Sequence, residues 1–242
     1  MPTDAGRISE IHMAGFASNA MLLAQFPTPE VREGLRESIR LKALADIEDP
    51  KITVLVVRDI LQPSDTSVMR GAEDGNFYYS EMNRMLNGCD SEESQMAKVI
   101  AFAKWSHPVG KDDDYEEAPW IWPPGTNMNV LEGWGRAAEE IQEQLMEYQP
   151  CYRLTFMGTD PSYERRGAAS MMVHWGLEQC RKDNAPGYLE STLDAAPFYQ
   201  KMGFTMSRQI SLRYQLEDRD RHEVYEELAF VYHPNPIYNI KK

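Results

Sequence analysis

The stretch that decides the fold runs from Cys151 to Ser170 and reads CYRLTFMGTDPSYERRGAAS. Its first part, Tyr152 to Met157, is rich in aromatic and aliphatic residues and predicts a strand. The segment Gly158-Thr159-Asp160-Pro161 breaks that strand, and a helical pattern follows Gly167. A helix that opens at such a turn presents unpaired backbone N–H groups at the positive end of its dipole, where anions bind.

Strands and helices are predicted on both sides of this stretch. Downstream we expect a strand, a short helix and two further strands, over residues 188–192, 195–202, 204–214 and 224–232. Upstream we expect helices over 8–21, 29–47 and 130–148 and strands over 52–57 and 99–105. We interpret residues 1–242 as one α/β domain, with the polar segment at about 60–96 as an insertion too long for a hairpin loop.

Composition limits the function classes. The 242 residues include 25 Lys and Arg against 38 Asp and Glu, a formal charge of −13. We therefore expect no nucleic-acid partner, because that binding needs clustered cations. Cys89, Cys151 and Cys180 form no zinc-type spacing, so we expect no metal. Neither a signal peptide nor an apolar run of membrane-spanning length is evident, so we expect no membrane contact and a cytoplasmic location.

The turn before the predicted helix carries features of a phosphate site. Gly167, Ala168 and Ala169 have small side chains that let a phosphate approach the backbone, and Arg165 and Arg166 place positive charge beside it. The GxxxxGK[ST] and GxGxxG motifs are both missing. From these residues alone, a diphosphate cradle and an ordinary helix N-terminus with surface arginines are equally open.

Two motifs together resemble the GNAT superfamily of acyl-CoA-dependent N-acyltransferases. The family's Q/R-x-x-G-x-G/A pattern appears as Glu164 to Ala169, with Glu164 at the Gln/Arg position. Its A-x-x-x-Y-x-K-x-G-F segment matches Ala195 to Phe204, and Thr192 stands where an Asn is common. The stretches FASNAMLLAQFP, KVIAFAKWSHP and PCYRLTFMGTDP also look like the small fungal-type GNAT proteins.

The resemblance implies a mixed twisted sheet with helices on both faces and two neighbouring parallel strands splayed apart. It implies acetyl-CoA as co-substrate, held by the main chain of the strand end and the turn and by residues near them: Met157, Gly158, Thr159, Glu164, Arg165, Arg166, Gly167, Ala168, Ala169, Ser170 and Thr192. We expect the family's first strand to be missing, which would leave an open edge at 52–57. We expect the insertion or a partner subunit, as in a homodimer, to cover it.

We expect an N-acetyltransferase acting on a small amine. In the family's motif Tyr199 is the acid that protonates the leaving thiolate; the alternative is an aromatic packed beneath a short helix. Glu190 is our candidate base, and a solvent-facing or Arg-paired carboxylate is the alternative. His12 and His107 are weaker candidates.

Two wider alternatives stay open: a CoA-binding protein whose acyl transfer is lost or redirected, and a non-catalytic interaction module. The aromatics Trp120, Trp122, Trp134 and Phe77 to Tyr79 either fill the core or wall an acceptor site. In the second case ring faces and the acidic charge favour a cationic amine.

Overall fold

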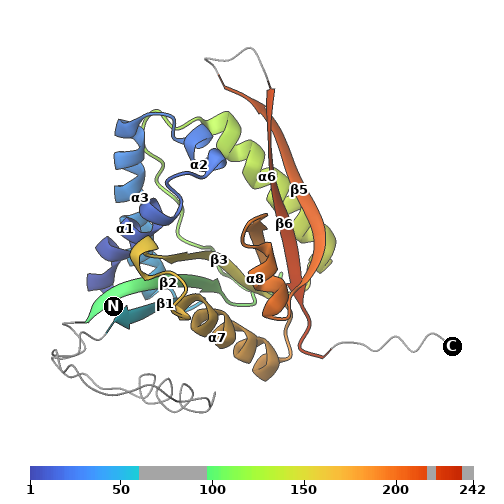
Figure 1. The fold of residues 1–242 in the computed structure, drawn as a ribbon. Coiled ribbons are helices and arrows are strands. Elements are labelled where there is room, and N and C mark those ends of the chain that lie inside the picture. The colour runs from blue at the N-terminus through green and yellow to red at the C-terminus, as the bar shows by residue number, and fades with distance from the viewer. Residues whose placement is uncertain (60–96, 217–221, 236–242) are drawn as a thin grey trace. The chain divides into compact units, whose positions relative to one another are not determined.

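The computed structural model describes residues 1–59, 97–216 and 222–235. Within these residues, six strands form one sheet in the order β1-β2-β3-β4-β6-β5 (Figure 1). Their bounds are β1 Ile52–Asp59, β2 Lys98–Ser106, β3 Tyr152–Thr159, β4 Gly187–Thr192, β5 Thr205–Gln215 and β6 His222–Tyr232. The pair β3 and β4 is parallel, whereas β2 with β3, β4 with β6 and β5 with β6 are antiparallel. The mixed sheet is the one predicted.

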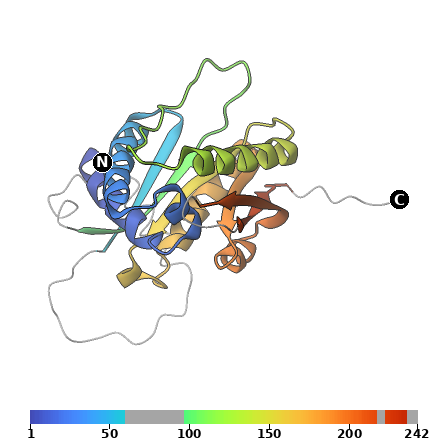
Figure 2. The ribbon, with the colours of Figure 1, turned by 90° about the horizontal axis from the view of Figure 1, so that it is seen from above.

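Helices lie on both faces of this sheet, as expected. They are α1 Ala5–Gly15, α2 Ala20–Gln25, α3 Pro29–Glu48, α6 Met128–Met146, α7 Ala168–Asp183 and α8 Ala196–Lys201, with short 3₁₀ turns at Pro2–Asp4 and Pro161–Tyr163. Figure 1 shows α7 on one side of β2 and β3 and α1 and α3 on the other. Seen from above, α6 lies across the near side of the strands (Figure 2).

The single helix predicted over 8–21 is wrong in its continuity. The chain leaves α1 after Gly15 and starts α2 at Ala20. Asn19 caps α2, because its side-chain oxygen accepts a hydrogen bond from the Leu22 N–H at 2.9 Å. An asparagine at such a place favours a helix start over a helix interior.

The chain divides into two compact units, residues 1–57 with 100–242, and residues 58–99. Of the second unit the structure describes the outer ends of β1 and β2, where Arg58 donates to the Ala97 carbonyl at 3.2 Å. The predicted insertion at about 60–96 lies outside the described residues. No strand precedes α1 in the described part, and β1 stands at the sheet edge; its predicted cover stays a prediction.

The core on the α7 face depends on one close approach. A Cβ on Gly176 would stand 2.1 Å from the Trp105 ring, so only glycine lets α7 lie this near β2. Trp105 is fully buried and donates from Nε1 to the Met172 carbonyl of α7 at 3.2 Å. This contact fixes α7, and with it the turn at its N-terminus, against the sheet.

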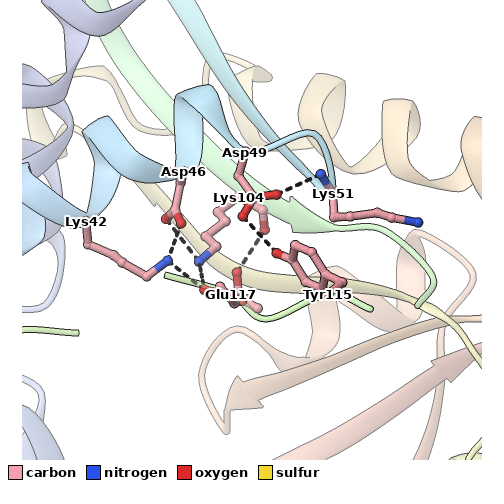
Figure 3. Close-up of polar contacts among 8 residues, drawn as sticks. Lys42, Asp46, Asp49, Lys51, Lys104, Tyr115 and Glu117 are labelled. Carbon is pink, nitrogen blue, oxygen red and sulfur yellow. Dashed lines mark hydrogen bonds and ion pairs between the residues drawn. The ribbon is translucent and has the colours of Figure 1, made fainter. Parts of the chain in front are cut away.

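On the opposite face a group of four charges, three of them buried and Glu117 partly exposed, joins α3, β2 and the segment that leads from β2 to α6 (Figure 3). Lys104 of β2 lies 3.0 Å from Asp46 of α3 and 2.6 Å from Glu117. Lys42 of α3 contacts Asp46 and lies 2.7 Å from Glu117. The two cations and two carboxylates balance in charge, and Glu117 ties the connecting segment to the core.

We predict that Asp46→Asn destabilises the protein by about 3–5 kcal/mol, because it leaves two buried ammonium groups facing one carboxylate. The matched control is Glu37→Gln, which breaks an exposed pair with Arg40 and should cost less than about 1 kcal/mol. Urea unfolding followed by circular dichroism measures both. Equal losses for the two variants would contradict the importance of the buried cluster.

Candidate functional site

The parallel strands β3 and β4 stay paired for only part of their length. Their register covers Tyr152 with Gly187, Arg153 with Tyr188 and Leu154 with Leu189. Beyond that point β3 continues to Thr159 beside β2, and β4 continues to Thr192 beside β6. The two strands therefore separate after Leu154 and Leu189, as the resemblance implies.

A β-bulge lies where the strands part. The β2–β3 register shifts between Lys104 and Trp105, so that Thr155 is the extra residue on β3. Its hydroxyl donates to the Lys104 carbonyl at 3.2 Å. A bulge bends its strand and increases the local twist, which accounts for the turn of β3 away from β4.

Backbone groups of β3 face the opened side. The Asp160 N–H donates to the Ile100 carbonyl at 2.8 Å, which marks a hydrogen-bonded pair of the antiparallel ladder. Since alternate residues bond the partner strand, Met157 and Thr159 direct their N–H and C=O groups away from β2. A ligand lying in the split can pair with these groups as an additional strand would.

Gly158, also predicted in the site, has a packing role in this structure. A Cβ there would lie 2.9 Å from Phe102 and 3.4 Å from Ile11 of α1. The glycine therefore makes room for α1 against β3, and its contact with a ligand stays a prediction.

The turn before α7 has the geometry of an anion site. Gly167 is the N-cap of α7 with φ +90°, and Arg165 also has a positive φ of 61°. The first intrahelical bond runs from the Met171 N–H to the Gly167 carbonyl, so the N–H groups of the helix's opening residues have no helical acceptor. A Cβ on Gly167 would meet nothing within 4 Å. The backbone is thus approachable at this point.

The side chains of the turn are exposed. Glu164, Arg165 and Arg166 all lie at the surface, and the Arg166 guanidinium sits 4.8 Å from the Tyr163 ring centroid. Main-chain donors and two arginines fit a diphosphate. The individual contacts predicted for Glu164 to Ser170, and for Thr192 at the end of β4, remain predictions.

Tyr199 of α8 lies in the core beside the split. It is 7% exposed, and its ring packs against Phe198, Phe204 and Phe230. Burial raises the pKa of Tyr199 above its ordinary value, and the negative charge of Glu227 adds to the rise. The phenol therefore stays protonated near neutral pH, which its predicted role as an acid requires.

Glu190 has a partner in this structure. Its carboxylate accepts a hydrogen bond from Arg153 Nη2 at 2.9 Å, joining β4 to β3 just where the strands part. This is the Arg-paired alternative that the sequence left open. Because an arginine already engages this carboxylate, the surroundings of Glu190 give its catalytic assignment no support, and the assignment stays a prediction.

Glu227 of β6 is a candidate that sequence reasoning missed. It stands in register with Thr192, and its Oε1 accepts a hydrogen bond from the Tyr225 hydroxyl at 2.6 Å. Burial raises the pKa of Glu227 to about 7; the Tyr225 bond opposes the rise and the charge of Glu190 adds to it. The signal was available, since strand alternation places Glu227 on one face with the apolar Ala229 and Val231.

The two histidine candidates lie in other surroundings. His12 is buried among the rings of Phe16, Phe102 and Phe156, and burial lowers its pKa to about 4. His107 shares a hydrogen bond of 2.8 Å with Thr53 and lines a groove of about 540 Å³ beyond the paired ends of β3 and β4. His107 lies at the end of the strands away from the split, whereas His12 packs on Phe156, in the part of β3 beyond its last pair with β4.

The three tryptophans considered for an acceptor site, Trp120, Trp122 and Trp134, pack against other aromatic and apolar side chains. Trp120 and Trp122 stack in parallel with centroids 4.8 Å apart and contact the buried cluster of α2 and α3. Trp134 of α6 meets the Tyr225 ring edge-on at 5.0 Å, which places it near Glu227. The Phe77 to Tyr79 cluster lies outside the described residues.

Two absences concern the described residues only. In residues 1–59, 97–216 and 222–235 no group of three or more His, Cys, Asp or Glu side chains is placed to hold a metal ion. Over the same ranges, no helix combines the length and the apolar character that crossing a membrane requires.

The chain is similar to known acyltransferases in sequence. The profile of the "Acetyltransferase (GNAT) family" matches residues 79–204. The "Probable acyltransferase SID5" of Ajellomyces capsulatus is 27% identical over 99 residues, which cover 40% of this chain and 67% of that protein. 

Among solved structures, the "insect putative arylalkylamine N-Acetyltransferase 7" of the yellow fever mosquito has a TM-score of 0.55 and 10% identity, and the match covers 96% of this chain and 84% of that one. The histone acetyltransferase HPA2 and related acetyltransferase of Corynebacterium glutamicum has a TM-score of 0.49 and 18% identity, covering 97% and 93%. At 10% identity the mosquito structure supports the fold alone.

We predict that Gly167→Val weakens CoA binding by about tenfold or more, because the side chain fills the space through which a phosphate reaches the backbone. Gly203→Val is the matched control: Gly203 also has a positive φ, of +99°, and open space at its Cβ, so it shares the strain and lies outside the turn. Calorimetric titration with CoA measures both. Unchanged affinity in Gly167→Val would contradict the cradle.

Proposed function

The chain belongs to the acetyltransferase (GNAT) family, and we propose that it transfers an acetyl group from acetyl-CoA to the amine of a small molecule. The observation that carries the proposal is the split between β3 and β4 beside the open turn of α7. One ligand can occupy both features if it has a diphosphate at one end and an extended amide-bearing arm at the other. CoA has this chemistry, and the family typically uses acetyl-CoA.

The residues divide the work of binding. The N–H groups at the start of α7, with Arg165 and Arg166, would hold the diphosphate. The outward-facing backbone of Met157 and Thr159 would pair with the extended arm and fix its direction along β3. When bound, acetyl-CoA supplies an activated acyl group; the chain must then orient an amine, remove its proton and protonate the departing thiolate.

Tyr199 is suited to the last of these tasks. Its phenol remains protonated because burial and a nearby carboxylate raise its pKa. It can donate a hydrogen bond to a developing thiolate and so stabilise the leaving group. It sits in the core cluster that also contains Leu154 and Leu189, the last paired residues before the split.

The acceptor is proposed to be a small amine that arrives as a cation. Glu190 and Glu227 both lie on the α6 face of the sheet near the split, and the chain as a whole is strongly acidic. A field of this sign attracts ammonium groups. The mosquito structure bears the name of an arylalkylamine acetyltransferase, and an amine with an aromatic body is accordingly the first acceptor to try.

The first test is binding followed by turnover. Acetyl-CoA at about 100 times its Kd should stabilise the protein by about 2.7 kcal/mol in thermal unfolding. Release of free thiol from acetyl-CoA is then screened over arylalkylamines, polyamines, amino acids and peptides. Binding without thiol release for any amine would favour a CoA-binding protein that has lost transfer, and absence of binding would favour an interaction module.

We predict that Tyr199→Phe lowers kcat about 10²-fold with the best acceptor, because the departing thiolate loses its proton donor. Tyr152→Phe is the control, since Tyr152 is buried in the same core cluster but gives its hydroxyl to Asp183 at the far end of α7. Steady-state thiol release measures both. Turnover within twofold of the parent in Tyr199→Phe would refute its role as an acid.

A further inference from the structure

We infer that Glu227 accepts the proton of the acceptor amine and that Tyr225 and Asn19 position its carboxylate. The inference rests on the proposed function and assigns the base that the sequence left without a supported candidate. It is carried by the place of Glu227 in the sheet, its hydrogen-bond chain and the contrast with Glu190.

Glu227 lies on the opposite face of the sheet from the turn before α7. On β6, Ala229 and Val231 pack with Ala138 of α6, whereas Phe230 packs with the α7 side of the core. Since side chains alternate along a strand, Glu227 points to the α6 face. Its register partner Thr192 is the last residue of β4, in the part that has separated from β3. An acyl group brought from the α7 side would thus meet an amine from the side of Glu227.

A directed chain of donors ends on this carboxylate. Asn19 Nδ2 donates to the Tyr225 hydroxyl at 2.8 Å, and that hydroxyl donates to Glu227 Oε1 at 2.6 Å. Trp134 packs edge-on against the Tyr225 ring and holds it in place. In the part of the chain that the structure describes, Glu227 Oε2 has no hydrogen-bond partner, so this oxygen remains to receive a proton.

Glu190 and Glu227, the two carboxylates on the α6 face, have different surroundings. Glu190 is paired with Arg153, while no cation contacts Glu227 among the described residues. The titratable groups that act on Glu227 are Glu190 of β4, Tyr199 of α8 and Tyr225 of its own strand. Its register partner on β5 is Ile210, and the α6 residues packed on this face are apolar: Trp134, Ala137, Ala138, Ile141 and Leu145. An unpaired, largely enclosed carboxylate favours its protonated form, and burial raises its pKa to about 7.

The proton balance of the step is complete with groups already named. An ammonium first loses one proton to Glu227, which passes it on to solvent and is again a carboxylate, and the neutral amine becomes the nucleophile. The amine nitrogen then bonds to the acetyl carbon as the C–S bond breaks; the second proton of the nitrogen passes to Glu227 and from there to solvent. The thiolate takes its proton from Tyr199, which solvent reprotonates. The products are an amide and free CoA.

The test compares the pH dependence of kcat/KM for the parent, Glu227→Gln and Glu226→Gln. Glu226 is the adjacent carboxylate on the opposite face, bonded to Gln209, and its variant should match the parent. We expect Glu227→Gln to lose about 10²-fold in kcat/KM at pH 7 and to lose the acid limb near pH 7, with CoA affinity unchanged. A loss below threefold with the limb retained would overturn the inference.

Tyr225→Phe gives a second readout should Glu227→Gln fail to fold. Removing this hydrogen bond takes away an interaction that lowers the pKa of Glu227, so the acid limb should move to higher pH. An unmoved limb would count against the inference.

Failure of the proposed function is visible in the parent protein alone, as absence of thiol release with every amine. In that event carboxyl ¹³C NMR of the parent and Glu227→Gln still decides the matter for Glu227. A titration near pH 7 that disappears in the variant supports an available proton acceptor, and one near the ordinary glutamate value of about 4.3 excludes it.

Discussion

The rest of this site depends on the early end of the pairing between β3 and β4. Two parallel strands normally satisfy each other's backbone along their full shared length. Here the ladder stops after Leu154 and Leu189, and each strand keeps its outer neighbour. The bulge at Thr155 supplies the bend, and the buried contact of Trp105 with α7 holds β2 and the helix in place while β3 turns. The split between β3 and β4 is therefore lined with main-chain groups that do not bond the neighbouring strand.

Different chemical groups lie on the two sides of the split. Toward α7 lie the glycine turn, the paired arginines and the buried Tyr199, which suit an anionic ligand and a leaving group. Toward α6 lies Glu227, which suits a cation, beside the pair of Glu190 with Arg153. Because the arginines of the turn and Glu227 stand on different sides of one sheet, the two substrates need not compete for the same surface. Although the net charge of the chain is −13, the arginines of the turn provide positive charge where an anionic ligand would bind.

Much of this arrangement follows from local sequence. The residue pattern around Gly167 predicts the strand, the glycine turn and the helix. Nearly all predicted elements are present within a few residues of their expected bounds. The break at Asn19 was missed because apolar spacing continues across it, although a helix-capping side chain stands there. In contrast, the Arg153–Glu190 pair joins residues on two strands, and only their pairing shows that Glu190 is already engaged. Glu227 lies outside both motifs, so neither of them points to it.

The measurement that tests the split most directly is amide hydrogen exchange with and without CoA. If CoA lies along β3 and its diphosphate rests on α7, exchange slows at Met157, Thr159 and the opening residues of α7. The paired residues Leu154 and Leu189 should stay as they are. If CoA leaves these amides unchanged, or protects instead the groove that contains His107 at the opposite end of the strands, then the split is not the binding site and the account is wrong.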